Sequence, residues 1–517
     1  MGSTGNAIEL PPLIPANHRW EVSKDVPNKV ERRGVGCEAI VGMKRSNTNG
    51  QYDLYLNLTL STANGPTAAT LTPSQLKDKL AAALLKVRFD HPECATTARW
   101  DEKVAPIIQY QSPDNQEAAL AWAQDSVHIR LTSQSGFQLR NEIEEYRHVH
   151  GTGGVPAKAV DIYLLADVMT DTTQLPQGTV FDVLLHMNHL FWDGISARHF
   201  TGDLLRALGQ YIDAAEPTEY PWGEEISNLS VPVLDALKVD PTAARGEFKA
   251  ACDQYVSDLY HNYGGRGLAF KKGTGLPRTE FLTFTPSESN ALLQAVKSRL
   301  GPKYTISHLA QAAVIVALLE ANPPTDLDDE SVFVTPMPVN GRRWLQDDIG
   351  KKYYSICETG AIVRCDNIKS LLVKRDTKKE TIIAALTQAC QDVKKSFDRA
   401  LSNPYQQPIG MAVHMLEASF LTQNPMPFDK VASPFFISDG RNEPFIPTEI
   451  VSNKGETVLS VDKTFFFLNQ FLPYLAIRLE SWKDASTLSV CYNDGNYSDE
   501  EATTYMKSVA HWMQAFV

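Results

Sequence analysis

A histidine and an aspartate stand four positions apart in the stretch HLFWDGIS, residues 189–196, and a glycine follows the aspartate. Histidine can remove a proton from a hydroxyl or an amine near neutral pH, because its reference pKa is about 6.5. An aspartate in this position can accept backbone N–H bonds at a helix start or pair with a buried arginine. One interpretation is therefore a general base at His189, aimed by Asp193, with Gly194 allowing the turn.

Two other interpretations fit the same residues. His186, His189 and Asp193 are residue types that bind metals, but a spacing of three between histidines suits a helix, and this stretch has the composition of a strand. We therefore expect no metal here. The remaining interpretation is structural: His189 satisfies hydrogen bonds at a strand end and Asp193 caps a helix. Patterns with so few fixed letters also occur by chance in long chains.

The surrounding sequence predicts where these residues lie in the fold. Residues 181–189, FDVLLHMNH, are aliphatic and β-branched enough for a buried strand, and residues 195–215 carry leucine and tyrosine at helical spacing. We expect His189 at the end of the strand and Asp193 at or just before the start of the helix. Ligand sites often form at such strand-to-helix turns, which gives the functional interpretation the same weight as the structural one.

Strand-like and helix-like segments alternate irregularly along the rest of the chain, which predicts a mixed α/β fold. Residues 279–300 predict a strand and then a helix that begins with a capping box of Thr285 and Glu288. Residues 304–321 predict a largely buried helix. Near the C-terminus, a strand at 487–492 precedes a helix capped by Ser498 and Glu501.

Two large halves are expected from the length of the chain. The stretch at 221–275 is rich in proline, glycine, acid and tyrosine and lacks a clean period, so we expect it to connect them. This division gives an N-terminal half at 1–220, which carries the histidine motif, and a C-terminal half at 276–517.

Two further predicted strands end in polar groups. PVNGRRWL, residues 338–345, places Arg342 and Arg343 after a strand, and FFISDGRN, residues 435–442, ends a strand in Ser438 and Asp439. Taken alone, each stretch suits a surface loop or a hairpin turn. Together with HLFWDG, they give three strand ends that carry polar side chains, and a cleft between two sheets needs such side chains. The chain has no GxSxG, GxxxxGK[ST] or strand-following GxGxxG pattern, so covalent catalysis by an activated serine or cysteine has no candidate.

Composition excludes several classes of function. A formal net charge of −12 argues against nucleic acid or an anionic membrane as a partner, since such binding needs a basic surface. We find no apolar run long enough to span a bilayer and no secretory signal. Seven scattered cysteines without a CxxC pair indicate reduced thiols. We expect a soluble, cytoplasmic protein.

The three stretches resemble a known superfamily. HLFWDG before an amphipathic helix, then PVNGRRWL, FFISDGR and the C-terminal strand and helix, is an order similar to that of CoA-dependent acyltransferases. These form the chloramphenicol-acetyltransferase and condensation-domain superfamily, which includes the BAHD enzymes. The resemblance covers nearly the whole chain. It implies two chloramphenicol-acetyltransferase-like halves, each a mixed sheet with flanking helices, around a central channel.

The resemblance also implies substrates. Acyl-CoA would enter the channel from one face and the acceptor from the other. Within the superfamily the chain is most similar to fungal enzymes that acetylate trichothecenes, which implies acetyl-CoA as co-substrate and a sesquiterpenoid alcohol, at carbon 15, as acceptor. An anionic cofactor needs a local basic patch, for which the candidates are in short basic clusters: Lys271, Lys272, Lys351 and Lys352.

Roles for individual residues follow from the resemblance. His189 matches the general base of the family, Asp193 its structural aspartate, and Arg342 the arginine that pairs with this aspartate. The acceptor oxygen would attack the thioester directly. BAHD enzymes carry an Asp-Phe-Gly-Trp-Gly motif that this chain lacks, and ISDGR stands at the equivalent strand end. Ser438 is therefore a candidate contact of the thioester or of its oxyanion.

Two alternatives stay open from the sequence. A condensation-type domain would join substrates held on carrier proteins, and a binding protein of the same fold would keep the channel without turnover. We expect a monomer that acts on a small molecule.

Overall fold

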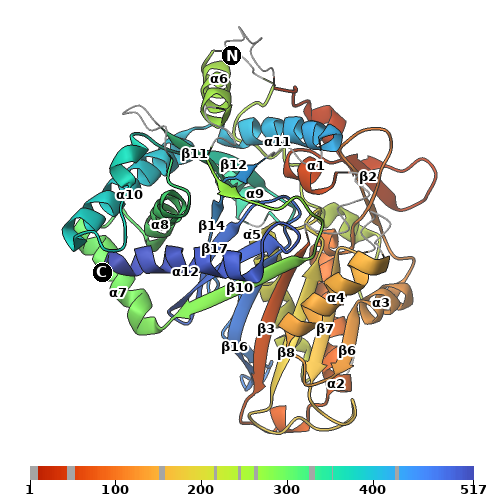
Figure 1. Cartoon of the computed structure of the whole chain (residues 1–517). Coiled ribbons are helices and arrows are strands. Elements are labelled where there is room, and N and C mark those ends of the chain that lie inside the picture. Colours follow the sequence, from red (N-terminus) through yellow and green to blue (C-terminus); the bar gives the residue numbers. More distant parts are fainter. Residues whose placement is uncertain are drawn as a thin grey trace.

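The computed structural model describes residues 10–43, 53–150, 158–214, 218–242, 246–260, 266–324, 332–351, 353–424 and 430–517. Two mixed sheets with helices packed on their faces form its two lobes, as Figure 1 shows. This arrangement confirms the predicted mixed α/β class.

The first lobe is built on a six-stranded sheet, in which only β6 and β7 are parallel neighbours. Its strands, in spatial order, are β15 (Glu449–Val451), β16 (Thr457–Leu468), β3 (Leu54–Thr62), β8 (Val180–Met187), β7 (Val160–Ala166) and β6 (Val127–Leu131). Helices α2 (Pro73–Asp90) and α5 (Gly194–Tyr211) pack against each other in the core of this lobe. Helix α4 (Gly136–His150) contacts β3 and β8. Its Leu139 belongs to a smaller cluster of buried side chains that includes Tyr55 and Phe467.

The second lobe is built on a four-stranded sheet, in which β14 and β17 are parallel. Its strands, in spatial order, are β10 (Pro277–Phe284), β18 (Ala485–Asn493), β17 (Ala476–Trp482) and β14 (Phe435–Arg441). Helices α8 (Ile306–Ala321) and α12 (Asp499–Ala515) contact this sheet and each other. The hairpin of β11 (Phe333–Asn340) and β12 (Glu358–Cys365) packs on α10 (Lys379–Ser402) and α11 (Gln406–Gln423).

Further helices, two small sheets and short 3-10 helices complete the elements that the structure describes. The other helices are α1 (Cys37–Val41), α3 (Gln116–Asp125), α6 (Glu247–Tyr260), α7 (Pro286–Leu300) and α9 (Asp347–Gly350). Two small sheets contain β1 (Glu21–Val22), β2 (Lys29–Arg33), β5 (Ile107–Gln111) and β4 (Thr97–Arg99), and β13 (Val431–Ala432) with β9 (Leu268–Ala269). The 3-10 helices are η1 (Pro15–His18), η2 (Ala68–Thr70), η3 (Pro92–Ala95), η4 (Glu224–Asn228), η5 (Gly341–Trp344) and η6 (Ile368–Leu371).

One strand links the lobes in a way that the sequence did not predict. Strand β16 comes from the C-terminal part of the chain but pairs with β3 in the sheet of the first lobe, beside which Figure 1 shows it. The expected connecting segment contains the helix α6. The proposed boundaries at residues 220 and 275 stay a prediction.

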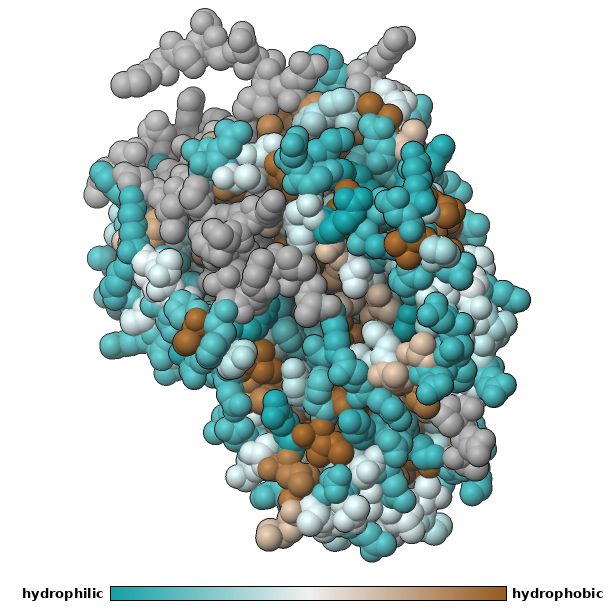
Figure 2. Space-filling view, turned by 90° about the vertical axis from the view of Figure 1, so that its right-hand side faces the viewer, coloured by the Kyte–Doolittle hydropathy of each residue, from teal (hydrophilic) through white to brown (hydrophobic). Residues whose placement is uncertain are grey.

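The surface shown in Figure 2 is mostly hydrophilic, and hydrophobic residues lie on it in small separate groups. Across the described part of the chain, no helix combines the length and the apolar character needed to cross a bilayer.

Candidate functional site

His189 lies two residues beyond the end of β8, in a tight turn that leads into α5. The side chain of Asn188 accepts a hydrogen bond from the Leu190 N–H, and the buried Trp192 indole donates to the Ala159 carbonyl. The Trp192 carbonyl oxygen lies 2.6 Å from His189 Nδ1. Because a carbonyl can only accept, Nδ1 carries the proton and Nε2 keeps its lone pair.

Burial favours the neutral form of this imidazole. His189 is 8% exposed, and burial lowers its pKa from the ordinary histidine value, although the hydrogen bond to Trp192 and the charge of Asp193 oppose this effect. A neutral imidazole with a free Nε2 lone pair is the form that a general base requires. This arrangement fits the predicted role of His189.

Asp193 is the N-cap of α5, and donors surround its carboxylate. Oδ1 accepts the backbone N–H groups of Ile195 (3.0 Å) and Ser196 (2.7 Å). Oδ2 accepts from Arg342 Nη1 at 2.9 Å and from the Cys357 N–H at 2.7 Å. Burial would raise the pKa of Asp193, but Arg342 and the backbone donors hold it below the usual value. With four hydrogen bonds, this carboxylate holds structure together and is not free for chemistry.

Arg342 ties the turn to the second lobe. It lies in η5, which begins with an Asn340 cap, and it is 7% exposed. Its Nε donates to the Tyr353 carbonyl at 2.9 Å and Nη2 to the Ser355 carbonyl at 3.0 Å. The predicted ion pair of Asp193 with Arg342 is thus present in the structure, 149 residues apart in sequence.

Gly194 has a different reason to be glycine than the one expected. Its backbone φ is not in the left-handed region, so the turn itself does not require glycine. A Cβ at this position would lie 3.1 Å from Arg198 Nη1, which donates to the Gly194 carbonyl at 2.6 Å. Gly194 therefore leaves room for the buried Arg198 side chain.

Arg198 connects α5 to the strand that carries Ser438. Its Nη2 lies 3.1 Å from Asp439 Oδ1, and Arg478 donates to the other oxygen of Asp439 at 2.7 Å. Both guanidinium groups lie over the Phe466 ring, at 4.6 and 4.7 Å from its centroid. The ISDGR and HLFWDG stretches are therefore neighbours in the fold.

Ser438 is exposed on β14, next to the paired Asp439. Its hydroxyl lies 2.6 Å from the hydroxyl of Ser307, in the first turn of α8. Either oxygen can be the donor in that pair. A hydroxyl pair at the first turn of a helix can donate to a developing negative charge.

The predicted CoA-binding lysines lie apart from these contacts. Lys271 is exposed, 3.5 Å from the Glu501 carboxylate, and Lys272 and Lys351 are exposed as well. Lys352 lies outside the described residues. The structure adds no support for this group as a phosphate site.

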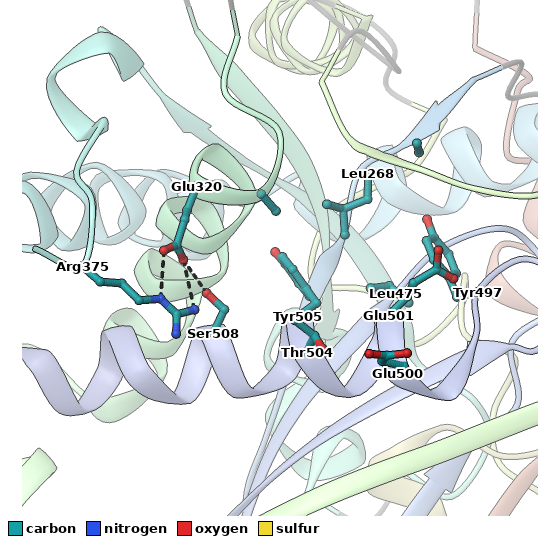
Figure 3. Close-up of a pocket in the computed structure, with 12 residues that line it drawn as sticks. Leu268, Glu320, Arg375, Leu475, Tyr497, Glu500, Glu501, Thr504, Tyr505 and Ser508 are labelled. Atoms are coloured by element: carbon teal, nitrogen blue, oxygen red, sulfur yellow. Dashed lines mark hydrogen bonds and ion pairs between the residues drawn. The ribbon is translucent and has the colours of Figure 1, made fainter.

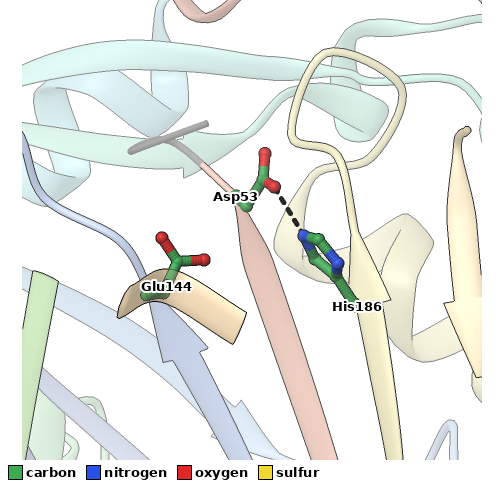
Figure 4. Close-up of side chains that lie close together, drawn as sticks. All are labelled: Asp53, Glu144 and His186. Carbon is green, nitrogen blue, oxygen red and sulfur yellow. Dashed lines mark hydrogen bonds and ion pairs between the residues drawn. The ribbon is translucent and has the colours of Figure 1, made fainter. Parts of the chain in front are cut away.

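One buried cluster near the site has metal-ligand chemistry. Ligand atoms of Asp53, Glu144 and His186 lie within 4.8 Å of one another, as drawn in Figure 4. Asp53 accepts from His186 Nε2 at 2.6 Å, and Arg147 forms ion pairs with both carboxylates. The Arg147 Nη1 atom also lies 3.1 Å from His186 Nε2. The guanidinium cation of Arg147 therefore contacts all three side chains. They form an ion-pair network rather than a metal site, and His189 and Asp193 are not part of it.

A cavity of about 470 Å³ lies between α8, α12 and β9, and Figure 3 shows its lining. Its Glu320 carboxylate is occupied by Arg375, Ser508 and Trp512. The cavity lies at the C-terminal end of α8, where Glu320 is about 20 Å along the helix from Ser307. None of the predicted site residues lines it.

Several supporting groups could not be expected from the sequence. The Cys357 N–H and the carbonyls of Tyr353, Ser355 and Trp192 are backbone atoms, and no residue type marks their role. Asp439 was visible in the ISDGR stretch, but its two arginine partners were not.

The chain is similar to several known proteins. A family model described as 15-O-acetyltransferase Tri3 matches residues 10–418. Trichothecene O-acetyltransferase TRI3 of Trichoderma arundinaceum is 58% identical over 98% of both chains. Trichothecene 15-O-acetyltransferase TRI3 of Fusarium sporotrichioides is 46% identical over 99% of both chains.

Solved structures extend the comparison. The structure of the Fusarium sporotrichioides enzyme matches with a TM-score of 0.93, covering 98% of this chain and 100% of the other. A condensation domain of the calcium-dependent antibiotic synthetase matches with a TM-score of 0.57 at 14% identity, covering 94% and 96% of the two chains, and so shares the fold.

Proposed function

We propose that this chain, which belongs to the 15-O-acetyltransferase Tri3 family, transfers acetyl from acetyl-CoA to a trichothecene hydroxyl by direct attack, with His189 as general base. The observation that carries the mechanism is the hydrogen bond from His189 Nδ1 to the Trp192 carbonyl, which leaves Nε2 available as the base. Asp193 and Arg342 hold the turn that aims the ring.

The proposed reaction has two steps. His189 Nε2 takes the proton of the acceptor hydroxyl while the oxygen forms a bond to the thioester carbonyl carbon. The tetrahedral intermediate then collapses, the C–S bond breaks, and the imidazolium returns its proton to the CoA thiolate. Direct transfer is supported by the state of the cysteines near the turn: burial raises the pKa of Cys357 to about 12, so this thiol is a poor nucleophile at neutral pH.

The proposal also covers the acylated carbon, the oligomeric state, the cellular location and the contacts of CoA. We assign carbon 15 as the acylated position because the relative from Fusarium sporotrichioides is named a 15-O-acetyltransferase. The chain would act as a monomer in the cytoplasm, and Lys271, Lys272, Lys351 and Lys352 stay candidate contacts of CoA. Release of free thiol from acetyl-CoA, measured with and without a trichothecene that has a free 15-hydroxyl, tests the function. Release that does not depend on this acceptor would overturn it.

Ser438 gives a prediction about the oxyanion. If its hydroxyl donates to the tetrahedral oxygen, Ser438→Ala should lower kcat about 10²-fold or more, because one such donor stabilises the transition state by about 2.7–4 kcal/mol. Ser307→Ala should have a smaller effect, since it removes only the partner of that hydroxyl. Steady-state kinetics with saturating acetyl-CoA measure both. An unchanged kcat in Ser438→Ala would assign the oxyanion to backbone N–H groups instead.

The lowered pKa of His189 predicts the acid side of the pH profile. The base works only when its imidazole is neutral, so activity should fall as the pH drops through the pKa of His189. Because burial lowers that pKa, the fall in kcat/KM should lie below pH 6.5. A profile of kcat/KM against pH measures it. A midpoint above pH 7 would mean that another group controls the reaction.

A further inference from the structure

Tyr354 carries an aromatic ring from the second lobe into the core of the first. It belongs to the segment that leads into β12, but its side chain is 3% exposed and lies in the cluster that packs around α2 and α5. The carbonyls of its two neighbours, Tyr353 and Ser355, accept from the Arg342 guanidinium. Tyr354 therefore stands between two of the contacts that hold the turn of His189.

The ring of Tyr354 is fixed by two helices of the first lobe. It stacks flat on the imidazole of His91, with 3.7 Å between the ring centroids and 1° between the ring planes. Its hydroxyl donates to Asp203 Oδ2 at 2.8 Å, and Asp203 Oδ1 pairs with Arg206 at 2.9 Å. His91 is the C-cap of α2 and Asp203 lies in the middle of α5. The position of the ring is thus set independently of the turn at His189.

Trp192 packs against this fixed ring. The rings of Trp192 and Tyr354 meet edge to face, with centroids 6.1 Å apart and planes at 68°. Trp192 is completely buried, packs on Phe200 of α5 at 4.9 Å, and donates its indole N–H to the Ala159 carbonyl. These contacts hold the residue whose carbonyl oxygen lies 2.6 Å from His189 Nδ1.

The tautomer of His189 depends on that carbonyl. A neutral imidazole carries one N–H, and the hydrogen bond that one nitrogen makes decides which nitrogen carries it. With the Trp192 carbonyl in place, the proton is on Nδ1 and Nε2 is basic. Without this acceptor the proton would be free to occupy Nε2, and an Nε2–H cannot take the proton of a hydroxyl. The position of Trp192 therefore sets the fraction of molecules with a usable base.

We infer that Tyr354 is a positioning residue, whose ring holds the Trp192 carbonyl against His189 Nδ1 and so keeps Nε2 basic. This inference rests on the proposed function, because it takes His189 to be the general base. Tyr354 is buried and acts through Trp192, without touching either substrate.

Replacing the ring tests this role. Tyr354→Leu should lower kcat by about 10–10²-fold, because a displacement of about 1 Å at a reacting group can cost about 10²-fold in rate. The KM of acetyl-CoA and that of the trichothecene should stay unchanged, since the buried ring contacts neither. Tyr354→Phe keeps the ring and should keep kcat within a few-fold of the unchanged chain. Steady-state kinetics, expressed per folded molecule, measure these values.

Nitrogen NMR of protein labelled at its histidines separates positioning from a general loss of stability. The spectra are recorded well above the ordinary histidine pKa of about 6.5, where the imidazole is neutral, and His189→Ala identifies the signal of His189. In the unchanged chain and in Tyr354→Phe, the proton should be on Nδ1. In Tyr354→Leu it should be shared between Nδ1 and Nε2.

Tyr110→Leu is the matched control. Tyr110, on β5, is likewise a buried tyrosine whose hydroxyl donates to a carboxylate, that of Glu225 at 2.9 Å. The same truncation there should lower the thermal midpoint. It should leave kcat per folded molecule and the tautomer of His189 as in the unchanged chain, because Tyr110 has no place in the proposed mechanism.

Three outcomes would overturn the inference: an unchanged kcat in a folded Tyr354→Leu variant, a lower kcat with the proton of His189 still on Nδ1, or a Tyr354→Phe variant as impaired as Tyr354→Leu. If Tyr354→Leu does not fold, Tyr354→Met decides, because its flexible side chain fills more of the space without a ring. Failure of the proposed function has a separate sign, which is that the unchanged chain releases no thiol with the trichothecene. The NMR comparison needs no turnover and then still tests whether Tyr354 sets the tautomer.

Discussion

His189→Ala should lower turnover by about 10²–10⁴-fold, measured as acceptor-dependent release of thiol from acetyl-CoA. The substitution removes the group that we propose takes the proton of the acceptor hydroxyl. Its fold should be retained, because among the described residues the imidazole bonds to the Trp192 carbonyl alone, and this carbonyl lies in a local turn. The thermal midpoint should therefore change little.

His199→Ala is the matched control for this result. His199 lies on α5 ten residues after His189, is partly buried, and has a pKa that burial also lowers. It packs edge-on against Phe445 and has no place in the proposed mechanism. Its turnover should stay within a few-fold of the unchanged chain. A His189→Ala protein with nearly full activity would contradict the assignment of the base.

Asp193→Ala should destabilise the protein by about 3–5 kcal/mol and lower its activity together with its stability. The substitution leaves the buried Arg342 guanidinium without its anionic partner and removes the acceptor of the Cys357 N–H. It also removes the cap of α5. Unfolding in urea, followed by tryptophan fluorescence and compared with the unchanged chain, measures the loss.

A double substitution identifies the origin of that loss. If the unpaired charge of Arg342 dominates, Asp193→Ala combined with Arg342→Met should be more stable than Asp193→Ala alone, because the uncompensated charge is gone. Asp193→Asn should keep part of the helix cap but still leave the arginine unpaired. An inactive Asp193→Ala variant with unchanged stability would give Asp193 a direct role in chemistry instead.

Local structure could be predicted well where one short segment contains all the information. The predicted capping boxes of Thr285 with Glu288 and of Ser498 with Glu501 are present. The strand before His189 and the helix after Asp193 also lie where the hydrophobic spacing placed them. In these segments neighbouring side chains and backbone groups decide the conformation.

Features that depend on distant parts of the chain could not be predicted. Strand β16 joins the sheet of the first lobe although most of its neighbours in sequence belong to the second, and no local pattern records that pairing. The close approach of Arg198 Nη1 to position 194 likewise exists only in the folded state.

The candidate site shows the same division. His189 and Asp193 were visible because their spacing forms a local motif. Arg342 was visible at the end of a predicted strand, but its pairing with Asp193 came only from the family resemblance. The Cys357 N–H, which completes the hydrogen bonds of Asp193, belongs to the backbone and has no sequence signal.

A crystal structure of the chain with CoA and a trichothecene that has a free 15-hydroxyl tests the central claim most directly. We expect the acceptor oxygen about 2.6–3.2 Å from His189 Nε2, with Nδ1 still bonded to the Trp192 carbonyl and Asp193 still paired with Arg342. The CoA sulfur should lie on the other side of that oxygen, toward Ser438. An acceptor hydroxyl bound out of reach of His189 Nε2, with another side chain as its hydrogen-bond acceptor, would contradict the proposed mechanism.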